Sequence, residues 1–372
     1  MTFRPLSKYW REAATIILTA GARKNATVTR VVADDLVPSR YNIFDYRVLM
    51  LQRSGKSGFM PNAKVFPGGL VDDSDFSDEW MDVFDRSGLG NFDSLTNIRN
   101  VDDRSPMLTA NQASLVPNDV GYRICAIRET FEESGILLTR PWNVPGADAA
   151  ISDDFLDEWR TRVDSNGREF LRLCQEHKRV PDVWSLHEWS NWLTPTSFRN
   201  RRYDTVFYMC CLDNIPPQTT HDKREMVKAQ WLSPPEILRD FRREEHWIPP
   251  PQVYELSRML NLPGLNQLHS FSQERGLEGC ERWLPVTIYL SDGAMTVLPG
   301  DDLFPDQPNL EKEQDLQMTG TLSESRQSTK NLNRLEFKER GVYSTTVCCN
   351  IEDKFGHLTP VQDVWSDDEE NV

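Results

Sequence analysis

Three glutamates, Glu129, Glu132 and Glu133, stand close together in the segment 128–136, which reads RETFEESGI. On a helix each residue advances by roughly 100°, so the three carboxylates share an arc of about 100°. Crowded carboxylates repel each other, and no lysine is interspersed among these three. Such a surface is typical of side chains that converge on a hard divalent cation, which takes oxygen ligands. The alternative is the solvated acidic face of an ordinary amphipathic helix.

The surrounding pattern resembles the Nudix box. In that box a glycine, five residues, a glutamate and seven residues precede R-E-U-x-E-E-x-G-U, where U is a bulky aliphatic residue. The second half is matched here by Arg128, Glu129, Glu132, Glu133, Gly135 and Ile136. By average residue usage, its five fixed letters arise by chance on the order of once in a few thousand chains of this length. The segment 66–69, which reads FPGG, supplies the glycine half of the box.

Three departures from the family pattern alter this box. Asp75 stands where the first glutamate is expected, and Thr130 replaces the usual aliphatic residue. Residues 76–120 are inserted between the two halves of the box. Lengthening a surface loop costs little entropy, so we expect an acidic, polar insertion with one helix around Trp80 that reshapes the mouth of the site.

A closer resemblance covers the chain from about residue 9 to 302. It is carried by the segments 58–69, 122–129, 189–195 and 281–285. They resemble the split-box Nudix enzymes known as peroxisomal acyl-coenzyme A diphosphatases. The resemblance implies an α/β fold, a Nudix α/β/α sandwich with a mixed β-sheet, a long insertion inside the box and a C-terminal extension.

The resemblance also implies roles for the residues of the box. Glu129, Glu132 and Glu133 are expected to bind Mg²⁺ or Mn²⁺, and one carboxylate to help deprotonate the attacking water. Glu225 is placed where many Nudix enzymes have a further catalytic carboxylate, although a plain surface residue is the alternative. Arg128, Gly135 and Asp75 are expected to be structural.

Four residues are expected to face the substrate. Arg53 matches the arginine of a coenzyme A signature that the segment 49–69 partly resembles. Phe66 precedes the glycine turn, and Gly68 and Gly69 let the backbone turn tightly beside the phosphates. The arginines of the segment 199–202 are a further candidate for the 3′-phosphate of coenzyme A, with a solvated loop as the alternative.

The reaction implied by the resemblance is hydrolysis of the diphosphate bond of coenzyme A and acyl-coenzyme A. Its products are 3′,5′-ADP and 4′-phosphopantetheine or its acyl form. The box addresses the diphosphate and not the groups attached to it, so NADH and ADP-ribose remain alternative substrates. A non-catalytic, nucleotide-binding Nudix module is a rival of another class, which the intact glutamates disfavour.

Hydrophobic patterns predict the elements that must position these residues. Buried strands are expected at 13–19, 46–53, 205–212 and 230–232. A helix is predicted over 121–134, with Gly135 as its left-handed C-terminal cap, and helical structure over 153–180. The segments 286–290 and 294–298 flank Ser291-Asp292-Gly293, which favours a hairpin.

These elements suggest three parts. We expect a Nudix domain over 9–245, a helical and hairpin extension over 246–302, and a loosely ordered, polar and acidic tail over 303–372. The tail is assigned from its charged composition.

Net charge, apolar stretches, cysteine spacing and the C-terminal residues limit the possible partners and the cellular compartment. The formal net charge is −15, which disfavours sequence-independent binding to nucleic acid. The longest nearly apolar stretch, 13–20, is too short to cross a bilayer. The seven cysteines include no C-x-x-C pair, which indicates reduced thiols inside the cell. The resemblance implies a peroxisomal location, but Glu370-Asn371-Val372 is no SKL-type signal, so the cytosol or mitochondrion is the alternative.

Overall fold

The larger sheet forms the centre of the molecule. The computed structural model describes residues 9–22, 43–110, 114–144, 153–198, 201–216, 219–222, 225–311, 316–338 and 344–362. Among them, the larger sheet has eight strands in the order β10-β7-β8-β1-β2-β3, with β4 paired to β1 and β9 to β2. These strands are β1 (Arg11–Gly21), β2 (Tyr46–Arg53), β3 (Lys64–Val65), β4 (Gly68–Leu70), β7 (His187–Leu193), β8 (Tyr203–Leu212), β9 (Met226–Leu232) and β10 (Arg282–Trp283).

Strand β1 lies in the middle of this sheet and explains its mixed character. It pairs in parallel with β8 and antiparallel with β2 and β4. Ile16 and Leu18 enter one core cluster and Ile17 the other, so side chains on both faces of the strand are buried. The continuous apolar run at 13–19 is the pattern of such a doubly covered strand.

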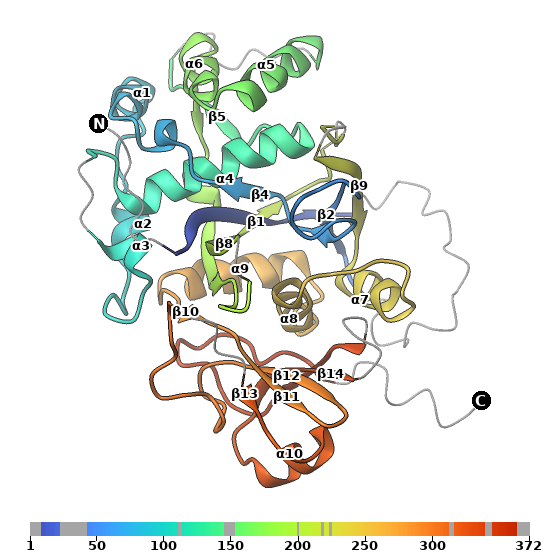
Figure 1. Cartoon of the computed structure of the whole chain (residues 1–372). Coiled ribbons are helices and arrows are strands. Elements are labelled where there is room, and N and C mark those ends of the chain that lie inside the picture. The colour runs from blue at the N-terminus through green and yellow to red at the C-terminus, as the bar shows by residue number, and fades with distance from the viewer. Residues whose placement is uncertain are drawn as a thin grey trace.

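Helices cover both faces of this sheet (Figure 1). On one face, hereafter the α4 face, lie α4 (Asn118–Ser134), α5 (Asp153–Ser165) and α6 (Arg168–Glu176). On the other, the α8 face, lie α7 (Pro234–Arg242), α8 (Pro250–Met259) and α9 (Leu265–Gly276). The predicted α/β/α sandwich with a mixed sheet is thus confirmed. No helix in the described part of the chain is long and apolar enough to span a membrane.

Residues 76–120 are folded rather than a polar loop with a single helix. They contain α1 (Glu79–Ser87), α2 (Asp93–Thr96), α3 (Pro106–Thr109) and the first turn of α4, and a 3₁₀ turn at Asp73–Phe76 leads into them. The insertion contributes several side chains to the core on the α4 face: Phe76, Trp80, Val83, Phe84, Phe92, Leu95 and Met107. The expectation of a polar insertion was wrong because acidic residues separate the apolar ones, which gather only in three dimensions.

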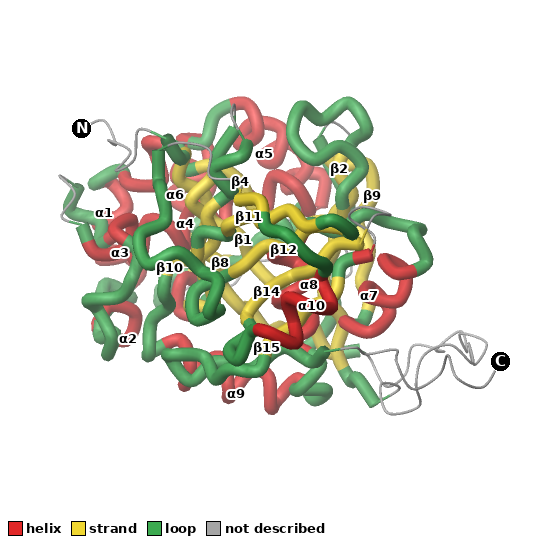
Figure 2. The backbone as a smooth tube through the Cα atoms, turned by 60° about the horizontal axis from the view of Figure 1, so that its bottom comes forward, coloured by secondary structure: helices red, strands yellow, loops and turns green. Residues whose placement is uncertain are grey.

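The chain beyond residue 303 is also folded over most of its described length. A second sheet has the order β13-β11-β12-β14-β15. Its elements are β11 (Val286–Leu290), β12 (Gly293–Val297), β13 (Leu316–Gln317), β14 (Asn333–Lys338), β15 (Thr346–Cys349) and the helix α10 (Leu322–Ser328). Figure 2 shows this smaller sheet lying across one side of the molecule, with α10 on its outer side. The predicted hairpin of β11 and β12 is confirmed by the pairing of Leu290 with Gly293.

The prediction of a loosely ordered tail was therefore wrong for this region. The buried Arg334 is paired inside the fold: its Nε and Nη2 donate to the two carboxylate oxygens of Asp301, at 2.6 and 2.7 Å. Leu335 and Val347 join the core cluster on the α8 face, so the smaller sheet packs on the larger part of the molecule. The acidic end, residues 363–372, lies outside the described residues.

Two short strands and a helix boundary complete the architecture. β5 (Thr139–Pro141) pairs with β6 (Arg179–Pro181), and a 3₁₀ turn at Val183–Ser185 leads into β7. The helical segment predicted over 153–180 is divided between α5 and α6. The helix predicted over 121–134 is confirmed as α4, and Gly135 ends it in the left-handed conformation at φ 74°.

A buried charged network fastens the insertion to the rest of the fold. The Arg104 guanidinium donates to Asp119 at 2.6 Å and to both oxygens of Glu188. The Cys280 thiol donates to Glu188 at 3.0 Å. Arg104 comes from the insertion, Asp119 from α4 and Glu188 from β7, so the network joins segments distant in sequence.

Removing the cation of this network should destabilise the whole protein. We expect Arg104→Ala to lower the free energy of unfolding by about 3–5 kcal/mol, because the buried Glu188 loses its guanidinium and Asp119 keeps only the longer contact with Arg123. Arg99→Ala is the matched control: Arg99 pairs with Glu278 in the same region, but its side chain is 64% exposed. That change should cost about 1 kcal/mol or less. Urea denaturation followed by fluorescence measures both, and equal losses would contradict the structural role of Arg104.

Candidate active site

The box glutamates on α4 face the glycine turn of β4. The backbone N–H of Gly68 donates to Glu133 Oε2 at 2.9 Å. A Cβ at Gly69 would lie only 2.2 Å from Glu129 Oε2. Gly68 itself has a φ of +152°, and a Cβ there would lie 2.5 Å from the Ala14 carbonyl oxygen. The two glycines therefore let β4 approach both β1 and the carboxylates of α4 closely.

Arg128 holds the two halves of the box together. Its Nε and Nη2 donate to the two oxygens of Asp75 at 2.8 and 2.9 Å, in a bidentate pair. Nη2 also donates to the Leu70 carbonyl at 2.8 Å. Nη1 donates to Glu129 at 2.9 Å and to Glu132 at 2.7 Å, so one guanidinium orients three carboxylates.

Asp75 is buried, and both of its carboxylate oxygens accept hydrogen bonds. Besides the pair with Arg128, its Oδ2 accepts from the backbone N–H of Asp72 at 2.9 Å, which closes the capping box of the 3₁₀ turn. Its position fits the predicted structural role: the shorter aspartate reaches Arg128 from a turn that packs against α4. Gly135 has its predicted role as the end of that helix.

Glu133 is buried and Glu129 and Glu132 are partly buried, with little positive charge around them. Burial raises the pKa of Glu129 and Glu133 and raises the pKa of Glu132 to about 8, while Arg128 opposes the effect at Glu129 and Glu132. The Arg128 guanidinium contacts Glu129 and Glu132 and is shared with Asp75, whereas Glu133 accepts from the Gly68 N–H. Four clustered carboxylates around one hydrogen-bonded guanidinium fit the binding of a divalent ion by Glu129, Glu132 and Glu133.

Arg53 and Glu225 come together at the adjoining ends of β2 and β9. Arg53 Nη2 donates to Glu225 Oε1, and Arg53 Nε donates to the Phe59 carbonyl at 3.1 Å. β2 pairs with β3, which leads into the glycine turn beside Glu133, so both residues lie near the box. After the larger effect of burial, the charge of Glu225 raises the pKa of Glu133 and that of Arg53 lowers it. The ion pair leaves Glu225 half exposed. The roles of Arg53 in substrate binding and of Glu225 in catalysis stay predictions.

Phe66 does not reach this surface, and its assignment to substrate binding is corrected. The residue is 2% exposed, and its ring packs edge-to-face on Phe207 at a centroid distance of 6.4 Å. Side chains alternate along an extended segment: Val65 packs toward the α4 face, and Phe66 points into the α8 face.

Phe59 was not among the predicted residues, although its carbonyl accepts the Arg53 hydrogen bond. Phe59 lies within the segment 49–69, whose partial resemblance to the coenzyme A signature is the sequence pattern that could have pointed to it.

A second acidic group lies on the α8 face. Asp240, Glu245 and His246 place one ligand atom each within 4.8 Å of one another, which is close enough for a metal ion. The positive charge of Lys64, 2% exposed on β3, acts on His246 and lowers its pKa, after the larger effect of burial. Asp240 belongs to α7 and the other two residues follow that helix, so this group lies on the face of the sheet opposite α4 and is separate from the box glutamates.

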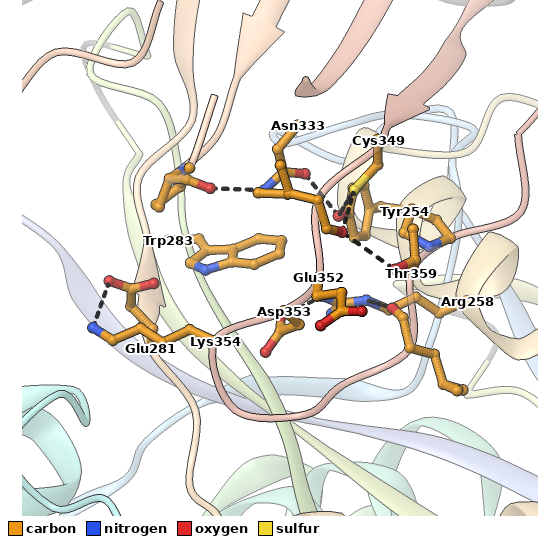
Figure 3. Close-up of a pocket in the computed structure, with 15 residues that line it drawn as sticks. Tyr254, Arg258, Glu281, Trp283, Asn333, Cys349, Glu352, Asp353, Lys354 and Thr359 are labelled. Atoms are coloured by element: carbon orange, nitrogen blue, oxygen red, sulfur yellow. Dashed lines mark hydrogen bonds and ion pairs between the residues drawn. The ribbon is translucent and has the colours of Figure 1, made fainter. Parts of the chain in front are cut away.

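A cavity of about 230 Å³ opens between α8, β10 and the smaller sheet (Figure 3). Trp283 and Tyr254 line it together with the buried Arg258, which donates to Asp353 at 2.9 Å. None of the residues that line it belongs to the box, β2 or β9. The cavity is therefore separate from the candidate active site.

Comparisons with known proteins agree with both parts of this fold. A family model described as the NUDT19 Nudix domain matches residues 10–259, and one described as the NUDT19 C-terminal domain matches residues 287–350. The chain is 42% identical over 378 residues to a Gallus gallus protein, acyl-coenzyme A diphosphatase NUDT19, with 96% of each chain covered. It is 39% identical over 378 residues to the Homo sapiens protein of that name, with 98% of each covered. A crystal structure of a NUDIX hydrolase from Alicyclobacillus acidocaldarius aligns at a TM-score of 0.49 and 20% identity, over 70% of this chain and 96% of that one.

The close contact between Gly69 and Glu129 makes a direct prediction about metal binding. Gly69→Ala should push the Glu129 carboxylate away from its position and weaken Mn²⁺ binding by about 10- to 100-fold. Electron paramagnetic resonance of free Mn²⁺ measures the affinity without any substrate. Gly264→Ala, before α9, is the control and should bind Mn²⁺ as the unmodified protein does. Unchanged affinity in Gly69→Ala at unchanged stability would refute the assignment of Glu129 as a ligand.

Proposed function

Because the chain belongs to the NUDT19 family of Nudix hydrolases, we propose that it hydrolyses the diphosphate bond of coenzyme A and acyl-coenzyme A. The products would be 3′,5′-ADP and 4′-phosphopantetheine or its acyl form. The observation that carries the proposal is the convergence of the three α4 carboxylates on the glycine turn, where Asp75, Glu129 and Glu132 share the Arg128 guanidinium and Glu133 accepts from the Gly68 N–H. The substrate is proposed from the names of relatives that match the chain over nearly its whole length.

The proposed metal is Mg²⁺ or Mn²⁺, held by Glu129, Glu132 and Glu133. When bound, such an ion neutralises the diphosphate, polarises the P–O bond and lowers the pKa of a coordinated water. Arg128 keeps the carboxylates of Glu129 and Glu132 in place through its two hydrogen bonds. Its bidentate contact with Asp75 fixes the guanidinium itself.

The carboxylates near the metal site accept the proton of the attacking water, and Arg53 binds the substrate. Glu133 or Glu225 accepts the proton of the attacking water; both carboxylates lie near the ends of β2 and β4. The Arg53 guanidinium exchanges part of its contact with Glu225 for a phosphate oxygen of the substrate. Since the box binds only the diphosphate, NADH and ADP-ribose are the alternative substrates to be compared with coenzyme A.

Product analysis tests this function directly. Incubation of the protein with coenzyme A and Mg²⁺ should yield 3′,5′-ADP, separated by chromatography. Glu133→Gln should lower kcat by about 10²–10⁴-fold, because the neutral amide neither accepts a proton nor binds the metal as a carboxylate does.

Glu158→Gln provides the matched control, since Glu158 is exposed on the neighbouring α5. This variant should keep the activity of the unmodified protein. Cleavage of ADP-ribose or NADH with no cleavage of coenzyme A would contradict the proposed substrate while leaving the box chemistry intact.

A further inference from the structure

Three aromatic side chains from two loops meet beside the Arg53 end of β2. The ring of Phe59, in the loop between β2 and β3, lies edge-to-face with Tyr203 at a centroid distance of 4.9 Å and with Phe198 at 6.2 Å. Tyr203 begins β8, and Phe198 belongs to the loop that precedes it. Phe198 is 42% exposed, so part of this aromatic surface is open to a ligand.

Arg201 lies against the same loop. A Cβ at Gly58 would be 2.8 and 2.9 Å from the Arg201 Nη1 and Nη2 atoms, so the absence of a side chain at Gly58 makes room for the guanidinium. Arg201 is exposed, and its guanidinium forms no hydrogen bond or ion pair with any other residue that the structure describes. It is thus a cation next to aromatic rings with its donors unused in the described part of the chain.

The next arginine anchors the loop. Arg202 donates to the Phe198 carbonyl at 2.8 Å and to the Thr196 carbonyl at 2.5 Å. Its backbone carbonyl accepts from the Arg11 N–H at 2.9 Å, at the start of β1. Arg202 therefore holds Phe198 in position, while Arg201 remains available for a ligand.

The aromatic surface adjoins the candidate active site through Arg53. The same guanidinium that pairs with Glu225 donates to the carbonyl of Phe59. Arg53 ends β2, which pairs with β3, and β3 leads into the glycine turn whose Gly68 N–H donates to Glu133 of the box. A substrate with its diphosphate at the box would thus have one of its two ends near Phe59.

We propose that Arg201, with the rings of Phe59 and Phe198, binds the 3′-phosphoadenosine end of the substrate. A purine stacks on aromatic rings, and a guanidinium binds a terminal phosphate with two parallel hydrogen bonds. An acyl chain would use the rings but not the guanidinium. The net charge of −15 disfavours phosphate binding elsewhere on the protein, so an exposed arginine with no ion pair among the described residues has a clear effect on such a group. This inference rests on coenzyme A being a substrate.

Comparison of coenzyme A with dephospho-coenzyme A, which lacks only the 3′-phosphate, isolates this contact. The unmodified protein should cleave coenzyme A with a kcat/KM about tenfold or more above that for dephospho-coenzyme A. Arg201→Ala should remove this preference and leave kcat/KM for dephospho-coenzyme A within about twofold. Phe198→Ala should raise KM equally for both, because both carry the adenine.

Two further variants and a binding measurement guard against indirect effects. Gly58→Ala should reduce the preference in the same direction by displacing the Arg201 guanidinium, and Arg86→Ala, at an exposed arginine of α1, should leave it unchanged. Calorimetry should show that Arg201→Ala binds 3′,5′-ADP no more tightly than AMP.

An Arg201→Ala variant that keeps the preference for coenzyme A would overturn the inference while the proposed function stands. The inference would also fail if Arg201→Ala or Phe198→Ala lost activity toward acyl-coenzyme A in proportion to the length of the acyl chain. That result would assign the surface to the acyl end of the substrate. If the unmodified protein cleaves neither coenzyme A nor dephospho-coenzyme A, the proposed function fails and the inference falls with it.

Discussion

The bidentate pair between Arg128 and Asp75 is the contact on which the candidate active site depends. It is buried and joins α4 to the turn that follows the glycine segment. A buried guanidinium is stable only when its donors are used, and here Asp75, Leu70, Glu129 and Glu132 accept them. The hydrogen bonds that use the donors of Arg128 therefore also orient two of the three box glutamates, Glu129 and Glu132.

The rest of the fold brings these two segments together. The insertion between them packs its aromatic residues into the core on the α4 face, and Arg104 ties it to β7 through Glu188. The smaller sheet packs on the opposite side, through Leu335 and Val347. Each added part thus extends one layer of the sandwich and leaves the ends of β2 and β9 beside the box.

Local patterns were sufficient for the elements and for most of the box. The spacing of the glutamates and the glycine at 135 identified α4 and its end, because both depend on helix geometry alone. The pairing of Arg53 with Glu225 could not be derived, since it depends on the neighbouring positions of β2 and β9 in the sheet. Phe66 was misassigned because the face to which an extended residue points depends on its strand partners. The charged region after residue 303 was misread because composition does not reveal that Arg334 and Asp301 are buried together.

The length of the insertion couples catalysis to complete folding. Asp75 and Arg128 are 53 residues apart in the chain, whereas an uninterrupted box would bring them together across a short loop. Their contact forms only after the intervening helices have packed. Closing so long a connection costs conformational entropy, which is compensated only when the core of the insertion has formed. In a nascent or partly unfolded chain, Arg128 would therefore lack its contact with Asp75, and the box glutamates would not be oriented. Hydrolase activity thus depends on the finished fold, and a chain whose insertion has not packed would lack it.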